Sequence, residues 1–318
     1  MSEPIRMPAN QPADRFYRGG SRIRNFRGTA DAGDRVPEDW VGSMTPLFGE
    51  QTIGLTTIDG ALLRDVVSAD PVGWLGPDHV RRWGSNPALL VKLLDAEERL
   101  PVHLHPDRNF ARAHLDSPFG KTEAWIALEP VTAWVGFSRP VSEGEIALWV
   151  AEQDTAAMLA SLSQVAIPRG SSIVIPAGVP HSLGEGAFVV ELQEPTDFTV
   201  LMEWRGFDID GVAAGHLGLG FDVALKSLDR SAWSTERVGS LVAGPGALSS
   251  AADGYFRAEF HHNGDTLDPG FSVLVVSRGV GTLSGHPVSK GDTWVIPFSA
   301  GPLMLEGDVD AVRCRPPA

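Results

Sequence analysis

Two histidines one residue apart, followed by a glutamate and a third histidine, constrain the fold of this chain more than any other feature. His103 and His105 stand two positions apart, so in a β-strand both imidazoles point to the same face. Glu123 opens the apolar run EAWIALE, and His181 follows GSSIVIPAGVP, whose glycines and prolines turn the chain. Three imidazoles and one carboxylate suit a first-row divalent metal. We therefore predict that these four residues bind a metal ion.

A His-x-His pair by itself also occurs by chance on surface strands. The glutamate and the second motif, G-x5-P-x-G-x2-H from Gly170 to His181, favour the metal site over that interpretation. Together the two motifs resemble the double signature of a cupin, a small antiparallel barrel with a metal at its open end. The 35 glycines and 24 prolines suit such a turn-rich β protein.

The chain of 318 residues is long enough for two domains. After Ser231 the stretch SLVAGPGALSSAADG indicates a linker, and a second barrel pattern begins at Tyr255. KGDTWVIP repeats half of the second motif without a histidine, so we expect no metal there. The predicted fold is mainly β, a double cupin of jelly-roll barrels with helical insertions. We expect an N-terminal arm of uncertain order at residues 1–35, a catalytic metal-binding domain at 36–235 and a degenerate, metal-free domain at 236–318.

Hydrophobic spacing predicts where the helical insertions lie. A buried strand, ALLVKLL, is expected to lead into the metal motif, and Lys92 within it needs a partner or a ligand unless it reaches solvent from a strand edge. Helices are expected at residues 59–69, 78–83, 110–116, 143–162 and 217–228.

The net charge limits the partners that the protein can bind, and the cysteine content indicates its redox compartment. The net charge of −14 argues against nucleic acid and anionic membranes, and an anionic substrate would need a locally cationic pocket. The one cysteine, Cys314, excludes an internal disulfide and fits a reducing compartment. The sequence shows no signal-peptide pattern and no membrane-spanning apolar run. We expect a soluble, cytoplasmic monomer or homodimer that binds a small sugar or sugar phosphate.

Four stretches resemble the class I mannose-6-phosphate isomerase family in order and spacing, from about residue 36 to the C-terminus: PALLVKLLDAEERLPVHLHPD, GKTEAW, IPAGVPHSLG and VVELQEPTDFTV. The resemblance implies a metal-dependent aldose–ketose isomerase that interconverts mannose 6-phosphate and fructose 6-phosphate. It implies one zinc per chain, with Mn, Fe or Ni as other candidates. His105, Glu123 and His181 match the family's metal positions, and His103 stands where the family usually has a glutamine.

The resemblance also implies roles for residues around the metal. Lys121 would contact a substrate oxygen or phosphate, unless it is a solvated lysine in a loop. Lys92 matches a family lysine of the substrate site. Asp197 matches an aspartate near the reacting carbons. Glu191 matches a strand carboxylate of the same site that can hold an imidazole in place.

Two departures from the family concern the substrate, and a third concerns the entry to the fold. Pro101 replaces a serine near the phosphate, and Leu201 replaces an arginine near the reaction. The first 35 residues lack the family's Trp-Gly-Gly signature. Arg205 lies four positions after Leu201, an even offset that keeps it on the same face of a strand, so we expect it to substitute for the arginine, with a surface arginine as the alternative. The alternatives to mannose 6-phosphate are an unphosphorylated or modified sugar, an iron-dependent cupin oxygenase and a sugar-binding cupin without catalysis.

Overall fold

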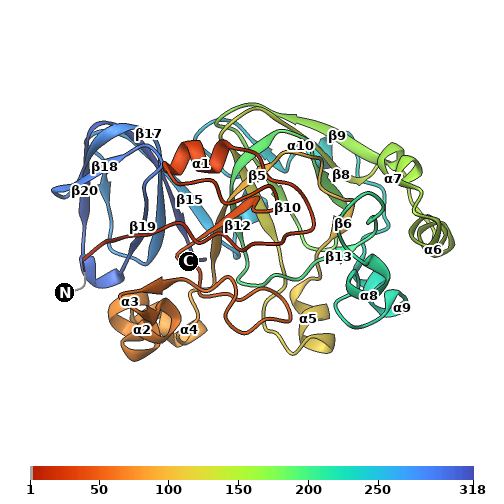
Figure 1. The fold of residues 1–318 in the computed structure, drawn as a ribbon, viewed down its shortest axis with the longest axis horizontal. Coiled ribbons are helices and arrows are strands. Elements are labelled where there is room, and N and C mark those ends of the chain that lie inside the picture. The colour runs from red at the N-terminus through yellow and green to blue at the C-terminus, as the bar shows by residue number, and fades with distance from the viewer. Residues whose placement is uncertain (1–2) are drawn as a thin grey trace.

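The computed structural model describes residues 3–318. Two units of antiparallel β-strands lie side by side, with helices attached around the first unit and below the second (Figure 1). The predicted class, mainly β with two barrels and helical insertions, is confirmed. No helix within residues 3–318 combines the length and apolarity needed to cross a membrane.

The first β unit is built from two antiparallel sheets. Its six-stranded sheet has the order β14-β10-β7-β12-β5-β2, and its five-stranded sheet has the order β13-β6-β11-β8-β9. The strands of the larger sheet are β2 (Glu38–Val41), β5 (Leu90–Ala96), β7 (Glu123–Ala127), β10 (Ser172–Ile175), β12 (Ala187–Gln193) and β14 (Val242–Ala243). Those of the smaller sheet are β6 (His103–Leu104), β8 (Val131–Phe137), β9 (Leu162–Ile167), β11 (His181–Leu183) and β13 (Val200–Leu201).

The second β unit is a seven-stranded sheet with the path β1-β19-β17-β20-β15 and two short strands beside it. Its first strand comes from the N-terminus, because Ile5 pairs with Val295 and Arg6 with Trp294. The strands are β1 (Ile5–Arg6), β15 (Arg257–His261), β16 (Thr266–Leu267), β17 (Ser272–Leu283), β18 (His286–Ser289), β19 (Thr293–Ile296) and β20 (Leu303–Arg315).

The larger sheet of the first unit is buried on both faces. In β5, Leu94 and Ala96 belong to the core inside the first unit. Val91 and Leu93 belong to the core shared with the second unit. Side chains alternate between the two faces of a strand, so one strand can serve both cores. This explains why β5, β7 and β12 are almost continuously apolar in sequence.

The helices differ from the predictions where a residue turns the backbone. Residues 143–162 form two helices and the start of a strand, because Gln153 is left-handed (φ 55°) and Asp154 caps a new helix through Ala157 N. The helix predicted from residue 59 begins at Leu63, because 59–60 form a hairpin turn.

The helices are α1 (Arg22–Arg27), α2 (Leu63–Ala69), α3 (Pro71–Leu75), α4 (Pro77–Trp83), α5 (Arg108–His114), α6 (Glu143–Glu152), α7 (Thr155–Ser161), α8 (Gly211–Ala214), α9 (Phe221–Ala224) and α10 (Thr235–Gly239). Three 3-10 turns are η1 (Leu225–Ser227), η2 (Ser250–Ala252) and η3 (Phe298–Ala300). A short hairpin is formed by β3 (Thr57–Ile58) and β4 (Ala61–Leu62).

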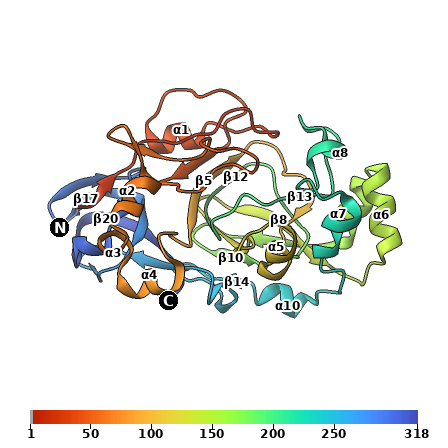
Figure 2. The same ribbon diagram turned by 90° about the horizontal axis from the view of Figure 1, so that it is seen from below.

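The N-terminal arm is an ordered part of the fold over residues 3–35; residues 1–2 lie outside the described part. Figure 2 shows it with α1 along one side of the molecule, beside β5 and β12. Asp95, at the end of β5, accepts hydrogen bonds from Arg22 N (2.6 Å) and Ile23 N (3.3 Å). A Cβ at Gly20 would lie 2.7 Å from Oδ1 of Asp95, so this close approach requires glycine.

A buried ion pair ties the arm to both β units. Arg27 Nε donates to Asp39 Oδ2 (2.8 Å), and the two side chains are 5% and 0% exposed. The same guanidinium donates to the carbonyls of Met7 (3.0 Å) and Gly291 (2.8 Å). Burial raises the pKa of Asp39, and the Arg27 charge opposes that rise. Arg27 therefore compensates a carboxylate that would otherwise be buried alone.

We predict that Arg27→Met lowers the free energy of unfolding by about 3–5 kcal/mol, because it leaves the Asp39 carboxylate buried without its cation. Urea denaturation followed by tryptophan fluorescence measures the change. Arg24→Met is the matched control, since Arg24 pairs with Asp31 at the surface, where ion pairs contribute at most about 1 kcal/mol. Equal losses in the two variants would contradict a special role for Arg27.

Candidate functional site

Three histidines and a glutamate form one buried cluster between the two sheets of the first unit. His103 in β6 and His181 in β11 are cross-strand partners, with ring centroids 4.1 Å apart. His105 follows β6 by one residue, and Glu123 reaches the cluster from β7 of the opposite sheet. One potential ligand atom from each side chain lies within 4.8 Å of all the others, and all four residues are buried. Among residues 3–318 this is the one such group of three or more, and it can hold a metal ion.

Backbone carbonyls orient the three imidazoles. Nδ1 of His103 contacts the Pro101 carbonyl at 2.8 Å, Nδ1 of His105 contacts the Phe198 carbonyl at 2.7 Å, and Nδ1 of His181 contacts the Val179 carbonyl at 2.8 Å. A carbonyl only accepts, so each Nδ1 must carry the proton. Each Nε2 then presents a lone pair to the cluster, which is the arrangement that a metal-binding histidine requires.

The cluster contains acceptors that face one another without a proton between them. Glu123 Oε2 lies 3.0 Å from His105 Nε2, and Glu123 Oε1 lies 3.2 Å from His181 Nε2. With the protons on Nδ1, none of these atoms can donate. Glu123 Oε2 and His181 Nε2 are accordingly buried without a hydrogen-bond partner. Buried acceptors left in this state are costly unless a cation lies between them, so the donor set fits a metal ion.

The protonation states agree with this interpretation. Burial lowers the pKa of His103 well below its ordinary value, and neighbouring His181 adds to the effect. Burial and the Lys121 charge lower the pKa of His105 to about 3. Burial alone would raise the pKa of Glu123, but the groups around it, the Lys121 charge among them, hold it well below the ordinary value. Neutral His103 and His105 and an ionised carboxylate are therefore ready to bind a cation at neutral pH.

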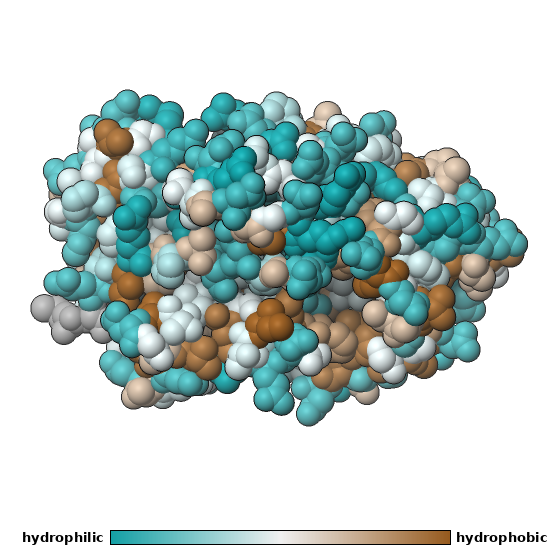
Figure 3. All heavy atoms as spheres, in the orientation of Figure 1, coloured by the Kyte–Doolittle hydropathy of each residue, from teal (hydrophilic) through white to brown (hydrophobic). Residues whose placement is uncertain are grey.

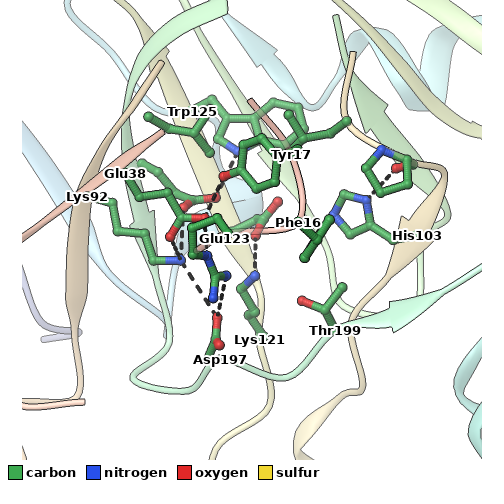
Figure 4. A pocket seen from close by; sticks show the side chains of 15 residues that line it. Phe16, Tyr17, Glu38, Lys92, His103, Lys121, Glu123, Trp125, Asp197 and Thr199 are labelled. Carbon is green, nitrogen blue, oxygen red and sulfur yellow. Dashed lines mark hydrogen bonds and ion pairs between the residues drawn. The ribbon is translucent and has the colours of Figure 1, made fainter. Parts of the chain in front are cut away.

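A cavity opens beside the cluster and is lined largely by charged side chains. In Figure 4 His103 lies at one end of the cavity and Lys92 at the other, with Glu123 and Lys121 between them. Lys121 is buried, with its Nζ 3.3 Å from His105 Nε2 and 3.4 Å from Glu123 Oε2. The cavity is lined by Arg15, Phe16, Tyr17, Glu38, Lys92, Leu94, Leu100, Pro101, His103, Lys121, Glu123, Trp125, Glu191, Asp197 and Thr199.

One cross-strand row builds the wall away from the cluster. Trp40, Lys92, Glu191 and Trp125 are successive partners across β2, β5, β12 and β7. Lys92 Nζ lies 4.4 Å from the Trp40 ring and 3.5 Å from Glu191 Oε2, and Trp125 Nε1 donates to Glu191 Oε1 at 3.1 Å. Lys92 is 2% exposed, so it does not reach solvent from a strand edge. The buried lysine has the partners that its sequence position requires.

Lys92 also faces Glu38 (3.5 Å) and Asp197 (4.0 Å). Burial would lower the pKa of Lys92, but Glu38 and Glu191 keep it above its ordinary value. Burial would raise the pKa of Glu38, but Arg15 and Lys92 bring it below the ordinary range. Glu191 differs from Glu38, because burial, aided by the Glu123 charge, raises its pKa to about 7 despite Lys92. The cavity therefore contains one carboxyl group that can exchange a proton near neutral pH.

The structure does not bring Arg205 to the cavity. Its exposed side chain donates to the Glu152 carbonyl (2.7 Å), at the end of α6. The even-offset prediction required a strand through residue 205, but β13 ends at Leu201. Leu201 itself is 3% exposed and does not line the cavity. Pro101 does line it and supplies the carbonyl that orients His103.

Sequence reasoning missed the contribution of the N-terminal arm and of β2. Arg15, Phe16 and Tyr17 enter the cavity from the arm, and Glu38 enters from β2. Tyr17 Oη donates to Glu38 Oε1 at 2.5 Å inside the protein. A local signal existed, since RFYRGG combines arginine with aromatics and Glu38 stands two residues before Trp40, on one strand face. Only the tertiary fold shows that both segments meet Lys92.

The first β unit and its cluster define a cupin, an antiparallel barrel with a three-histidine, one-glutamate site. No protein-family model matches the chain. The probable mannose-6-phosphate isomerase GmuF of Bacillus subtilis (strain 168) is 29% identical over 195 residues, which are 60% of this chain and 58% of that relative, less than two thirds of its length. The mannose-6-phosphate isomerase ManA of the same organism is 26% identical over 314 residues, 93% of this chain and 97% of that one.

A solved structure of a candidate mannosephosphate isomerase from Archaeoglobus fulgidus matches with a TM-score of 0.80 and 19% identity, covering 100% of this chain and 99% of that one. The structural match confirms the predicted cupin fold along the whole chain. Along nearly its whole length the chain is distantly similar to proteins named mannose-6-phosphate isomerases.

We predict that Glu123→Ala and His181→Ala each weaken zinc binding by more than about 100-fold. Loss of a residue that only orients a metal ligand typically weakens binding about 10- to 100-fold, and loss of the ligand itself should weaken it more. His103→Gln should keep a weaker site, since an amide oxygen replaces a more basic nitrogen. Titration calorimetry and metal analysis give affinity and stoichiometry. His262→Ala is the matched control, because His262 pairs with Asp310 in the second unit. Uptake of no divalent metal by the wild type would contradict the site.

We predict that the stability of the metal-free wild type, relative to Glu191→Gln, falls as the pH rises from 4.5 to about 7. The folded pKa of Glu191 is raised above its ordinary value of 4.5, so the folded state retains a proton that the unfolded chain releases over this range. One proton corresponds to at most about 1.4 kcal/mol per pH unit. Urea denaturation at several pH values measures the difference. Glu129→Gln, at an exposed position, should show no such trend, and a flat difference for Glu191→Gln would contradict the raised pKa.

Proposed function

We propose that this chain is a metal-dependent aldose–ketose isomerase that interconverts mannose 6-phosphate and fructose 6-phosphate. The observation that most supports the proposal is a buried metal-binding cluster that opens directly onto a cavity lined by lysines and carboxyl groups. The names of the relatives point to the same reaction. Zinc is the first metal to test, followed by Mn, Fe and Ni.

The reaction moves a proton between C1 and C2 of the sugar through a cis-enediol. A metal ion held by His103, His105, Glu123 and His181 would polarise the carbonyl group. Lys121, next to the cluster, donates to a sugar oxygen. Glu191 has a pKa near 7 and a buried Oε2 without a hydrogen-bond partner, so it is suited to accept a proton or a sugar hydroxyl.

Asp197 and Lys92 complete the proposed sugar site. Asp197 Oδ2 accepts the Phe48 amide at 3.2 Å, which fixes the carboxylate at the cavity edge, where we expect the reacting carbons to lie. Lys92 keeps Glu38, Glu191 and Asp197 together behind the sugar. Arg205 is not part of the proposed site. In this proposal residues 36–235 form the catalytic domain, residues 236–318 form a domain without its own metal, and the arm at 1–35 supplies side chains to the cavity.

A second substrate class, a sugar without phosphate, is favoured by the charge pairing in the cavity. Lys92 lies within 4.0 Å of three carboxylates, and Lys121 lies 3.4 Å from Glu123. Pro101 has no hydroxyl for a phosphate. A phosphate dianion would have to compete with these carboxylates, whereas neutral hydroxyl groups can bind between carboxylates and cations without separating them.

Turnover of a sugar panel by metal-loaded protein, in the absence of oxygen, tests the proposal. We expect mannose 6-phosphate to be isomerised, and Lys121→Ala to raise the KM of whichever sugar is turned over on the order of 10- to 100-fold, as for loss of one charge-assisted hydrogen bond to a sugar oxygen. Lys290→Ala, an exposed lysine of the second unit, is the control.

Each other result has a specific meaning. Equal or better turnover of free mannose would show that the substrate is a sugar without phosphate, and the isomerase function would stand. Turnover that requires oxygen would indicate an oxygenase. Saturable sugar binding without turnover would contradict the enzyme and favour a sugar-binding protein.

A further inference from the structure

One side chain in the cavity has hydrogen-bonding groups that the protein leaves unused. The Arg15 guanidinium lies 3.4 Å from Glu38 through Nε and 3.9 Å from Asp197 through Nη2. Both distances are too long for good hydrogen bonds. Nε is buried and has no hydrogen-bond partner. The side chain is only 15% exposed, so water cannot fully replace the missing partners. A buried guanidinium in this state indicates a ligand with oxygen atoms.

The arm holds Arg15 in this position independently of a ligand. Arg15 N donates to the Arg35 carbonyl at 3.1 Å, and Gly19 N donates to the Asp34 carbonyl at 2.8 Å, so the arm folds back on itself. Between these contacts Tyr17 is anchored to Glu38. Gly19 also bridges to Ala96 at the end of β5. The backbone around residue 15 is therefore fixed on both sides, and the guanidinium does not have to be ordered when a substrate binds.

The charge on Arg15 is permanent. Burial opposes the charged form, but Glu38 and Asp197 raise the pKa of Arg15 above its ordinary value. Lys92 shares the same two carboxylates but is held against the Trp40 ring. Among the residues of the described chain that line the cavity, Arg15 is the one arginine. It is thus the arginine of the cavity, and it has donors left for a substrate.

We propose that Arg15 is a catalytic residue that donates hydrogen bonds to the sugar oxygen that becomes negatively charged during isomerisation; this rests on the proposed isomerase function. When a base removes the proton from C2, that electron pair forms the C1–C2 double bond. The C1 carbonyl π pair moves to its oxygen, which becomes an enediolate oxyanion. Return of a proton to C1 and transfer of the O2 proton to O1 give the ketose. Arg15 neither gains nor loses a proton, and its charge stabilises the oxyanion.

Kinetics of Arg15→Met, Arg15→Lys and Arg15→Ala test this role. We expect Arg15→Met to lower kcat on the order of 100-fold, as for loss of an oxyanion donor, with KM changed only a few-fold. Arg15→Lys should retain part of the rate, and methylguanidinium should partly restore Arg15→Ala. Arg18→Met is the matched control, because Arg18 lies in the same arm, is exposed and pairs with Glu98. It should keep wild-type kcat.

Binding provides a readout that does not depend on turnover. An aldonohydroxamate in its ionised form carries the negative charge of the enediolate, whereas the corresponding sugar alcohol is neutral. Calorimetry should show that Arg15→Met weakens binding of the hydroxamate by more than about 10-fold and leaves binding of the alcohol nearly unchanged. Only the hydroxamate carries the charge that Arg15 stabilises. If Arg15→Met does not fold, Arg15→Lys and the rescue experiment decide the same question.

Several outcomes would overturn the role of Arg15. These are a wild-type kcat in Arg15→Met, a loss confined to KM, an equal loss in Arg18→Met, or equal weakening of hydroxamate and alcohol. Absence of wild-type turnover with every sugar would count against the proposed isomerase function, and the two binding measurements would still decide whether Arg15 recognises the charged analogue.

Discussion

Burial of the larger sheet of the first unit on both faces is the constraint on which the rest of this structure depends. One face packs inside the barrel and the other packs on the second unit, so no side of the sheet faces solvent. A charged side chain in such a sheet must find a partner within the protein. Glu38, Lys92, Glu123 and Glu191 all project from its strands. Their mutual neutralisation, and the metal that the cluster can hold, are what make a charged cavity compatible with this core.

The cluster was accessible from the sequence because its information is local. A two-residue histidine spacing defines a strand face, and a glycine- and proline-rich turn marks the approach to His181. The pairing of β6 with β11 then brings the two segments together. The partnership between Lys92 and Glu191 was partly accessible, since both lie in strongly apolar strands. Their register, in which Glu191 lies directly opposite Lys92, required the tertiary pairing of β5 and β12.

Two failures of prediction come from where regular elements end. An even offset from Leu201 to Arg205 means nothing once β13 ends after two residues, and one left-handed glutamine divides a helical pattern into two helices. The arm was harder still to predict. Its hydrogen bonds go to Asp34, Asp95 and Glu97, and no periodic pattern in RFYRGG points to those residues. Composition marked this segment as unusual, but only the fold assigns it a position.

The pairing of β1 with β19 has a consequence for how the protein is made. The strand that begins the arm pairs with residues 293–296, close to the other end of the chain. During synthesis strand β1 leaves the ribosome long before its sheet partner β19. Domains ordinarily fold one after another as they emerge. Here the barrel with the cluster can form first, whereas strand β1 finds its partner only after residues 293–296 have been made.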